Sequence, residues 1–359
     1  MKLLFYCQHS VGLGHLMRSY ALCEALTARF QVVLLAGGEL PDGIAPPQGI
    51  EVVALPPLGV RPGGFGSGDP RLSTERAWEI RLERILQTFR AVEPDVVLVE
   101  LFPFGRAKFM REIVPLLEVA RATKALRACS LRDLLVSTRA TQRAYDDRAR
   151  ELADAHLDAV LVHCDPRFAR LEETFRPSRA LRVPVHYTGF VARRATEPAE
   201  RGDHIVVSAG GGRVGLPLMR EAIAAAQGRT LRVIAGPLMP DDDYRALQRE
   251  APPNVELKRS VPDLAAELSK AAASVSQCGY NTALDLIRTR VPALVVPYAT
   301  PEEDEQTRRA HRLRDLGVVQ VATHVNGQLQ HLPDFTPKPA ALDLDGAAKT
   351  TDLLMELIA

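Results

Sequence analysis

Residues 276–285 place a glycine, an amide, a hydroxyl and a carboxylate where a buried strand gives way to a helix. Asn281 and Thr282 fall at the helix N-terminus, whose unpaired N–H groups and positive dipole end suit a diphosphate. Asp285 lies three residues after Thr282, so the two side chains share one helix face. A carboxylate there can accept hydrogen bonds from sugar hydroxyls while the turn at Gly279 holds phosphate. This spacing predicts a nucleotide-sugar site.

A glycine-rich turn predicts a second phosphate contact. The apolar strand at 204–208 runs into Gly210, Gly211 and Gly212, which Arg213 follows. Glycines let backbone N–H groups approach a phosphate closely, and the guanidinium adds a charge-assisted donor. The turn is not a Walker loop, because no Gly-Lys-Ser or Gly-Lys-Thr follows. A plain turn between a strand and a helix is the alternative interpretation.

A carboxylate and an amide, Glu305 and Gln306, follow the strand that ends at Pro297. The loop leaving this strand should border the same crevice as Asp285, and such groups read vicinal hydroxyls well. We therefore expect Glu305 and Gln306 near the sugar. The alternative is a solvated acidic helix start at 302–306.

In the first half of the chain, His15 is a candidate general base. It follows Gly12 and Gly14 after the first strand, where a backbone N–H and an imidazole that titrates near neutrality can face a ligand. Gly14 is thus a candidate donor contact, although the third glycine of a dinucleotide fingerprint is missing. Glu100 ends a strand at the sheet's carboxyl edge, where it could orient His15 or bind the acceptor. The alternative for His15 is a hydrogen-bonded capping histidine, and the alternative for Glu100 is a helix-capping or interdomain ion pair.

Two further charged groups have competing interpretations. Arg132 and Asp133 leave a strand as a pair that could bind the acceptor or could be structural. The run 241–243 contains the Asp-x-Asp pattern of metal-dependent sugar transferases, but it follows Pro240 and fits an acidic helix start. We predict no metal site and no cofactor.

Two segments bear on the acceptor. The loop 56–70 is rich in Pro, Gly and Ser, which predicts a mobile or functional segment or a disordered insertion. The helix 71–91 carries arginines beside apolar side chains, so it is a packed element with a solvated face, or it contacts acidic acceptors or lipid headgroups. Peripheral membrane contact stays open.

Composition limits the class of protein. The 359 residues exceed one ordinary core, and 46% apolar and 25% charged residues are typical of a soluble globular protein. Lys and Arg total 45 against 44 acids, which gives no support to bulk nucleic-acid binding. Five scattered cysteines without CxxC spacing, and the lack of a signal-peptide core, favour the cytoplasm.

Short β-branched runs alternate with helical patterns, which predicts an α/β fold with parallel sheets. We expect strands near 2–7, 31–36, 51–54, 95–99, 125–129, 158–163, 204–208, 230–235, 254–258, 272–276, 292–296 and 318–321. We expect helices near 14–28, 74–91, 106–121, 137–154, 166–174, 215–227, 242–250, 262–270, 280–289, 303–315 and 345–358.

The series breaks at 189–203, a candidate linker without apolar periodicity. We expect an acceptor-side Rossmann-like domain at 1–190 and a donor-binding one at 203–340, with a C-terminal helix at 345–359 that packs back across the domains. Two doubly wound halves of this kind would face a cleft at the carboxyl ends of both sheets.

These motifs resemble glycosyltransferases of the GT-B architecture, in particular family 28, which includes the peptidoglycan N-acetylglucosaminyltransferase. The matching elements are the turn 210–212, the segment Gly279, Thr282, Asp285, and the pair Glu305-Gln306. The sequence departs from the family at Asp285, where Glu is expected, and at Arg309, where Asn is expected. Asp is one methylene shorter, so the reach to the ribose changes.

The resemblance implies a role for each matching residue. It places the turn 210–213 with Asn281 and Thr282 on the diphosphate, Asp285 on the ribose, Glu305 and Gln306 on the sugar, and the Val261 backbone on the base. It also implies a uridine diphosphate sugar as the donor.

The amino-terminal motif Gly12-x-Gly14-His15-x-x-Arg18 is similar to the superfamily's acceptor-side loop, which makes Arg18 an acceptor-side candidate. It is also similar to the nucleotide-sugar hydrolase of pseudaminic acid biosynthesis, where the matching histidine is the proposed base. The whole chain, including 130–133 and 187–190, resembles a bacterial group of predicted glycosyltransferases.

The sequence thus predicts a metal-independent, inverting glycosyltransferase that moves a sugar from a nucleotide donor to an unidentified small-molecule, glycan or lipid-linked hydroxyl acceptor. A nucleotide-sugar hydrolase that uses water as acceptor and a non-catalytic nucleotide-sugar-binding protein are the alternatives. An epimerase would need a matched pair of catalytic acids, which we do not find.

Overall fold

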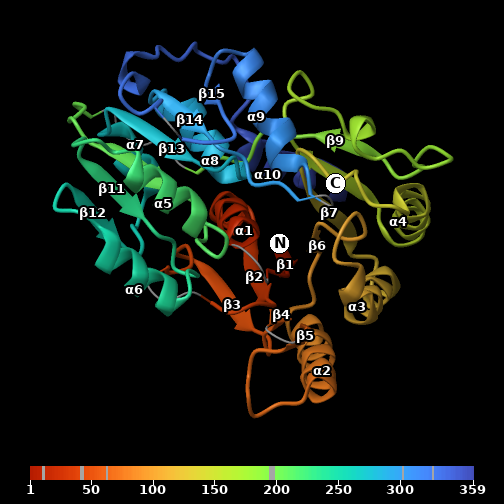
Figure 1. The fold of residues 1–359 in the computed structure, drawn as a ribbon. Coiled ribbons are helices and arrows are strands. Elements are labelled where there is room, and N and C mark those ends of the chain that lie inside the picture. Colours follow the sequence, from red (N-terminus) through yellow and green to blue (C-terminus); the bar gives the residue numbers. More distant parts are fainter. Residues whose placement is uncertain (10–12, 41–43, 62–63, 194–198, 301–302, 326) are drawn as a thin grey trace. The chain divides into compact units, whose positions relative to one another are not determined.

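The computed structural model describes residues 1–9, 13–40, 44–61, 64–193, 199–300, 303–325 and 327–359. The chain divides into two compact units (Figure 1). The first unit consists of Met1–Leu40, Ala45–Arg193 and Leu342–Ala359, and the second is mainly Arg194–Ala341. Part of the expected linker, 194–198, lies outside the described residues.

The first unit is built on a seven-stranded parallel sheet with the order β3-β2-β1-β6-β7-β8-β9. Its strands are β1 (Lys2–Cys7), β2 (Gln31–Ala36), β3 (Ile50–Ala54), β6 (Val96–Glu100), β7 (Leu126–Arg132), β8 (Ala159–His163) and β9 (Val185–Tyr187). The central strands are continuous apolar runs that are buried on both faces, as expected where helices cover both sides of a parallel sheet.

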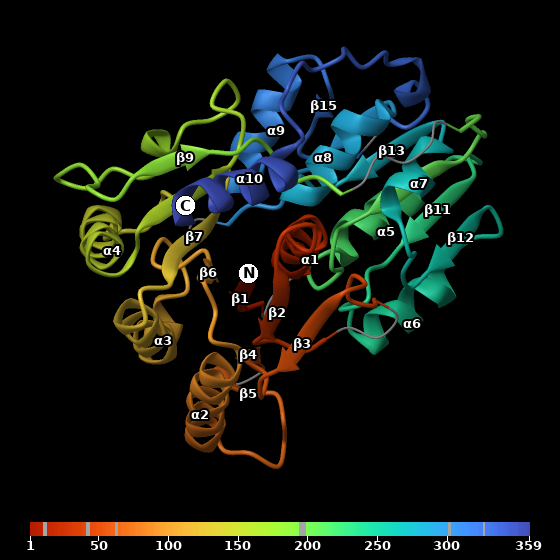
Figure 2. The same ribbon diagram turned by 180° about the vertical axis from the view of Figure 1, so that it is seen from behind.

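Helices cover both faces of this sheet (Figure 2). They are α1 (Gly14–Leu26), α2 (Thr74–Val92), α3 (Met110–Ala122), α4 (Gln142–His156) and α10 (Gly346–Ile358). Ser73 caps α2 by accepting a hydrogen bond from the Arg76 N–H. The last helix, α10, packs against α1, so the end of the described chain returns to the first unit.

The second unit has a six-stranded parallel sheet with the order β12-β11-β10-β13-β14-β15. Its strands are β10 (Ile205–Ser208), β11 (Leu231–Ile234), β12 (Val255–Lys258), β13 (Ala273–Ser276), β14 (Ala293–Val295) and β15 (Gln320–Val321). Its helices are α5 (Leu216–Ala224), α6 (Asp241–Glu250), α7 (Leu264–Ser269), α8 (Tyr280–Thr289) and α9 (Glu305–Asp315). The predicted α/β class with two doubly wound, Rossmann-like units is confirmed.

Each sheet contains a point at which the strand order changes direction. In the first unit the series β3-β2-β1 meets β6-β7-β8-β9, and in the second β12-β11-β10 meets β13-β14-β15. The connections after the two flanking strands run to opposite faces of the sheet, and the carboxyl ends of such strands are where open α/β sheets bind ligands. The switch points therefore lie between β1 and β6 and between β10 and β13.

The structure corrects three expectations. The helix expected at 166–174 is only a short 3₁₀ turn at Leu171–Glu173, and the edge strand β9 was not predicted. The loop 56–70 contains a hairpin of β4 (Leu58–Arg61) and β5 (Gly64–Ser67), with residues 62–63 outside the described part. The hairpin is anchored because Phe65 packs on Trp78 and Phe109, a long-range contact that local composition does not reveal.

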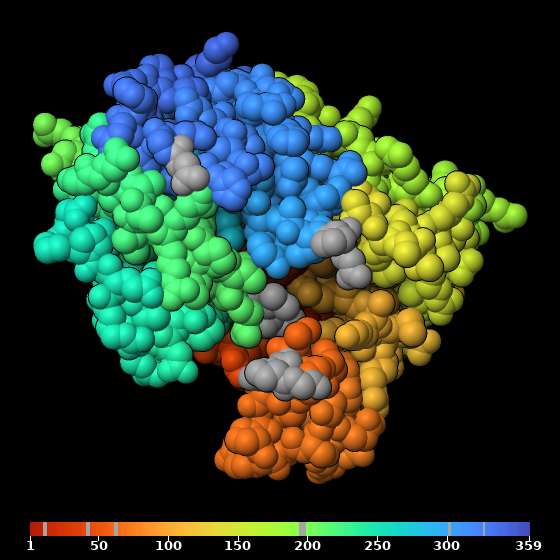
Figure 3. Space-filling view, viewed as in Figure 1, coloured from red at the N-terminus to blue at the C-terminus, as the bar shows by residue number. Residues whose placement is uncertain are grey.

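The arginine-bearing helix α2 has one packed and one solvated face. Trp78 and Arg81 are buried, whereas Arg76 and Glu79 form an exposed ion pair. Helix α2 belongs to the orange segment at the bottom of Figure 3. Among the described helices, none is both long and apolar enough to cross a membrane.

Candidate functional site

At the switch point of the first unit, four charged or ionisable side chains meet. Glu100 is the last residue of β6 and is completely buried. His15 Nδ1 lies 2.6 Å from Glu100 Oε1, and an Arg18 terminal nitrogen donates to the same oxygen at 2.5 Å. His15 and Arg18 are three residues apart on α1, so one helix face presents both to the carboxylate. The sequence hypothesis that Glu100 orients His15 agrees with this geometry.

Arg106 is a member of the cluster that the sequence did not predict. Its Nε and one terminal nitrogen both lie 3.3 Å from Glu100 Oε2, so the second carboxylate oxygen is also occupied. Arg106 adopts a left-handed backbone conformation, with φ 61°, in the loop after β6. Leu101, at the start of the same loop, is also left-handed, and the loop returns the Arg106 side chain to Glu100. A basic residue six positions after a strand-ending carboxylate was the available signal.

The environment keeps the imidazole neutral and the carboxylate charged. Burial lowers the pKa of His15 to about 3, and it outweighs the attraction of Glu100, while Arg106 and Arg132 lower the pKa further. Burial alone would raise the pKa of Glu100, but His15, Arg106 and Arg18 hold it well below its usual range.

This arrangement fixes which nitrogen of His15 can act as a base. Nδ1 faces a charged carboxylate, so we assign the proton to Nδ1, where it is donated to Glu100. Nε2 then carries the lone pair and makes no hydrogen bond to another described residue. The side chain is 19% exposed, so solvent or a ligand can reach part of the ring.

The other acceptor-side candidates lie at the same sheet edge. Arg132 ends β7 and is partly buried, and its charge acts on the His15 imidazole. Asp133 follows it and is buried. Gly14 is the first residue of α1 and is exposed.

In the second unit, the predicted glycine turn follows β10. Gly210 and Gly212 have φ values of 56° and 90°, which L-residues rarely adopt. A Cβ on Gly212 would lie 2.1 Å from the Ala235 carbonyl oxygen, whereas one on Gly210 would meet nothing within 4 Å. Gly212 is thus required for packing, and Gly210 presents open backbone.

Gly211 and Arg213 complete this turn. The Gly211 carbonyl accepts a hydrogen bond from the Leu238 N–H at 2.9 Å, which ties the turn to the loop after β11. The Arg213 side chain is exposed and has no hydrogen bond or ion pair with another described residue. Two buried hydroxyls without a described partner, those of Ser208 and Ser276, end the strands on either side of the switch point.

The second predicted element follows β13. Gly279 is the N-cap of α8, has no side chain to cap the helix, and faces open space in the direction of a Cβ. Thr282 is buried, and Asn281 and Asp285 are partly buried on the first turns of α8. The helix N-terminus therefore opens at the switch point, as the sequence predicted.

Side chains of α9 connect the loops after β13 and β14. Gln306 Oε1 accepts hydrogen bonds from the Cys278 N–H at 3.0 Å and the Tyr298 N–H at 3.2 Å. Two N–H donors identify this atom as the amide oxygen, so only the Gln306 NH₂ group is left for a sugar hydroxyl. Glu305 is buried, which disagrees with a solvated acidic helix start. Arg309 is buried too and donates to the Cys278 carbonyl at 2.7 Å.

Val261 lies in the loop after the edge strand β12, before Asp263 caps α7. The Gly turn, the α8 N-terminus and Gln306 share the carboxyl edge of β10, β13 and β14, and Val261 lies further along that edge. Sequence reasoning did not anticipate that the Gln306 oxygen and Arg309 serve the backbone.

The acidic run 241–243 starts a helix, as predicted. All three aspartates lie in the first turn of α6, where Asp242 pairs with Arg245 and Asp241 with Arg259. Within the described ranges, no group of three His, Cys, Asp or Glu side chains is arranged to hold a metal ion.

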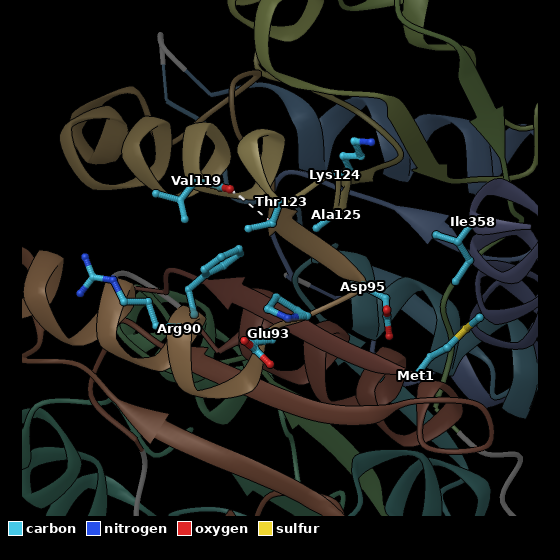
Figure 4. Close-up of a pocket in the computed structure, with 11 residues that line it drawn as sticks. Met1, Arg90, Glu93, Asp95, Val119, Thr123, Lys124, Ala125 and Ile358 are labelled. Carbon is cyan, nitrogen blue, oxygen red and sulfur yellow. Dashed lines mark hydrogen bonds between the residues drawn. The ribbon is translucent and has the colours of Figure 1, made fainter.

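A pocket of about 520 Å³ lies at the opposite edge of the first sheet, at the amino ends of its strands. Met1, Asp95, Lys124 and Ile358 are among its lining residues (Figure 4). None of the candidate residues lines it.

Comparison with known proteins places the fold. No protein-family model matches the sequence, and no curated protein matches it. Among solved structures, spinosyn forosaminyltransferase is similar at a TM-score of 0.60 with 16% identity, covering 100% of this chain and 94% of that one.

Two other solved structures have comparable similarity. The MurG protein of Acinetobacter baumannii has a TM-score of 0.57 and 17% identity, covering 99% of this chain and 100% of that one. Glycosyltransferase VinC in complex with dTDP has a TM-score of 0.56 and 17% identity, covering 100% of this chain and 96% of that one. At such low identity these likenesses establish the fold alone, and the chain has the GT-B fold that its motifs predicted.

Proposed function

We propose that the protein is a glycosyltransferase that moves a sugar from a nucleoside diphosphate donor to a hydroxyl acceptor. The observation that carries the proposal is the pairing of a neutral His15 with a buried Glu100 at one switch point, while the other offers glycine backbone and a helix N-terminus. The first arrangement suits proton removal, and the second suits an anion. Solved structures of similar fold include transferases bound to dTDP and to UDP-2-fluoro-glucose, which supports a donor of this class.

In the proposed reaction, His15 Nε2 takes the proton of the acceptor hydroxyl as its oxygen attacks the anomeric carbon. The bond between that carbon and the diphosphate oxygen breaks, and its electron pair leaves with the diphosphate. Attack from the opposite side inverts the anomeric centre. Glu100 stabilises the imidazolium that forms, and general-base help of this kind contributes roughly 10²–10⁴ in rate.

The second unit would stabilise the leaving group. N–H groups of the turn 210–212 and of the α8 N-terminus, together with Arg213, would share the negative charge that develops on the diphosphate. Asn281 and Thr282 would contact the diphosphate, Asp285 the ribose, Glu305 and the Gln306 NH₂ group the sugar, and the Val261 backbone the base. No metal ion and no cofactor enters this scheme.

The assignment of acceptor binding and donor binding to different parts of the chain belongs to the same proposal. We assign acceptor binding to 1–190, with Arg18, Arg132 and Asp133 as contacts and Gly14 near the donor. We assign donor binding to 203–340. Uridine as the nucleoside and the cytoplasm as the location are also proposals.

The test is a coupled assay of the full chain with a panel of UDP and dTDP sugars, with and without hydroxyl acceptors. We expect one donor to raise the melting temperature, since a ligand that binds only the native state stabilises it by mass action. We expect that donor to release nucleotide when an acceptor is present. If no nucleotide sugar binds or turns over, the proposal is wrong.

A nucleotide-sugar hydrolase is the second candidate, because a base held as His15 is held can equally activate water. Incubation with donor alone distinguishes the two. Rapid, stoichiometric release of sugar and nucleotide without acceptor identifies a hydrolase, and release that depends on acceptor identifies a transferase. Tight binding of a nucleotide sugar without turnover under any condition would identify a non-catalytic nucleotide-sugar-binding protein.

A further inference from the structure

Cys278, the residue before the α8 N-cap, has both of its backbone polar groups held by α9. Its N–H is donated to Gln306 Oε1 at 3.0 Å, and its carbonyl accepts from Arg309 Nη1 at 2.7 Å. Gln306 and Arg309 are three residues apart, so one face of α9 grips the two peptide units that flank Cys278. Cys278 is fully buried, and Arg309 is only 1% exposed.

These two hydrogen bonds fix the direction of the next N–H group. In a planar trans peptide the carbonyl and the N–H point in opposite directions. Since the Cys278 carbonyl points at the buried guanidinium, the Gly279 N–H points away from it. That N–H makes no hydrogen bond to another described residue, and open space surrounds the Cβ direction of Gly279.

Arg309 also brings a permanent charge close to the same peptide. Arginine stays protonated at any pH of interest, and a buried guanidinium is little screened by solvent. Because the guanidinium keeps its proton, the Cys278 carbonyl keeps its donor, and the resulting orientation of the peptide favours an anion in front of Gly279.

We propose that Arg309 is a positioning residue for the donor: it turns the Cys278–Gly279 peptide so that the Gly279 N–H binds the second phosphate of a nucleoside diphosphate. This inference rests on the proposed function and deepens it. On this inference, Arg309 is the reason that the donor site binds a nucleoside diphosphate more tightly than a nucleoside monophosphate.

The test measures the binding of UDP and UMP to the full chain by calorimetry. We expect the wild-type protein to bind UDP on the order of 10-fold or more tightly than UMP, since a hydrogen bond to a charged group has that value. In Arg309→Met this ratio should fall toward one while UMP affinity changes little. Arg309→Lys, which keeps a cation and a donor, should restore part of the ratio.

Arg314→Met is the matched control. Arg314 lies on the same helix, is half exposed and, among the described residues, forms an ion pair only with Asp315, so its loss should leave the ratio unchanged. An Arg309→Met variant that folds and keeps the full ratio of UDP affinity to UMP affinity overturns the inference. So does an equal loss of UDP and UMP affinity, which would indicate general damage to the loop.

A second pair of variants tests the N–H group directly if Arg309→Met does not fold. Gly279 has φ −62°, which proline also adopts, so Gly279→Pro removes the N–H with little backbone change. Gly279→Ala keeps the N–H and serves as its reference. We expect the proline variant to lose more of the UDP preference than the alanine variant, and equal ratios would contradict the inference. If the wild-type protein binds neither nucleotide, the proposed function itself fails.

Discussion

The two units share one topology but use their switch points differently. In the first unit the edge is occupied by side chains, with a histidine and two arginines converging on a buried carboxylate. In the second, the edge is mostly backbone, with glycines at positive φ and an uncapped helix N-terminus. In the proposed function, the same fold supplies proton chemistry where side chains converge on a carboxylate and anion binding where glycine backbone is exposed.

The largest effect that tests this comparison is expected from His15→Ala. If the first switch point does the proton chemistry, turnover should fall by roughly 10²–10⁴ while donor affinity stays near its wild-type value. Initial rates of transfer and calorimetric donor binding, measured side by side, check this. His331→Ala, at an exposed position of the second unit, is the control and should leave both unchanged. Unchanged turnover in His15→Ala would refute the base role.

Alanine substitutions at two glycines of the second switch point should affect stability and donor affinity separately. Gly212→Ala should lower the free energy of unfolding by about 2 kcal/mol or more, because the new Cβ would overlap a backbone carbonyl. Gly210→Ala meets open space, so it should lose mainly donor affinity, apart from about 1 kcal/mol of left-handed strain. Thermal unfolding and donor titration of both variants measure the difference. Equal melting temperatures would contradict this assignment.

Arg106→Met tests the electrostatics of the first switch point. Arg106 lowers the pKa of His15, so its removal should raise that pKa. A histidine acts as a base only above its pKa, so the acid limb of the kcat/KM profile should move to higher pH. In the wild-type protein, with a pKa of about 3 for His15, this limb should not appear between pH 8 and pH 6.

Profiles of both proteins from pH 8 down to the lowest pH at which each stays folded provide the measurement, with the exposed Arg111→Met as control. A limb that stays in place, or moves to lower pH, would show that Arg106 does not act on His15.

The smallest expected effect concerns metal. The aspartates at 241–243 serve the start of α6, so neither a chelator nor Asp242→Asn should change the rate of transfer. Assays with and without EDTA, followed by readdition of Mg²⁺ or Mn²⁺, check this. Activity that is lost with EDTA and returns with a divalent ion would contradict metal independence.

Local pattern predicted the fold well where apolar runs are long and bounded. The expected strands at 2–7 and 31–36 coincide with β1 and β2, and the expected helix at 280–289 coincides with α8. Prediction failed for the short edge strand β9 and for the β4–β5 hairpin, whose glycines gave a loop signal. The aromatic contact that holds this hairpin joins Phe65 to Phe109, a separation that periodicity cannot detect.

The sequence predicted the candidate site to about the same extent as it predicted the fold. Glu100 and Gly279 were found because each ends or follows a buried strand, a position set by local sequence. Arg106 was missed because the loop that returns it to Glu100 contains two left-handed residues, Leu101 and Arg106, which local sequence does not reveal. Gln306 was predicted to contact the sugar; the additional hydrogen bond that its oxygen accepts from the N–H of Cys278, 28 positions away, was not predicted.

The return of the chain to the first unit has a consequence for biosynthesis. Residues 342–359 complete the first unit: α10 packs against α1, the Asp343 N–H donates to the Asp165 carboxylate, and the Asp343 carbonyl accepts from the Phe190 N–H. A ribosome makes these residues only after the whole of 199–341. The unit translated first is therefore finished last, and during that interval of many seconds the apolar surface of α1 depends on chaperones or on the nascent chain for cover.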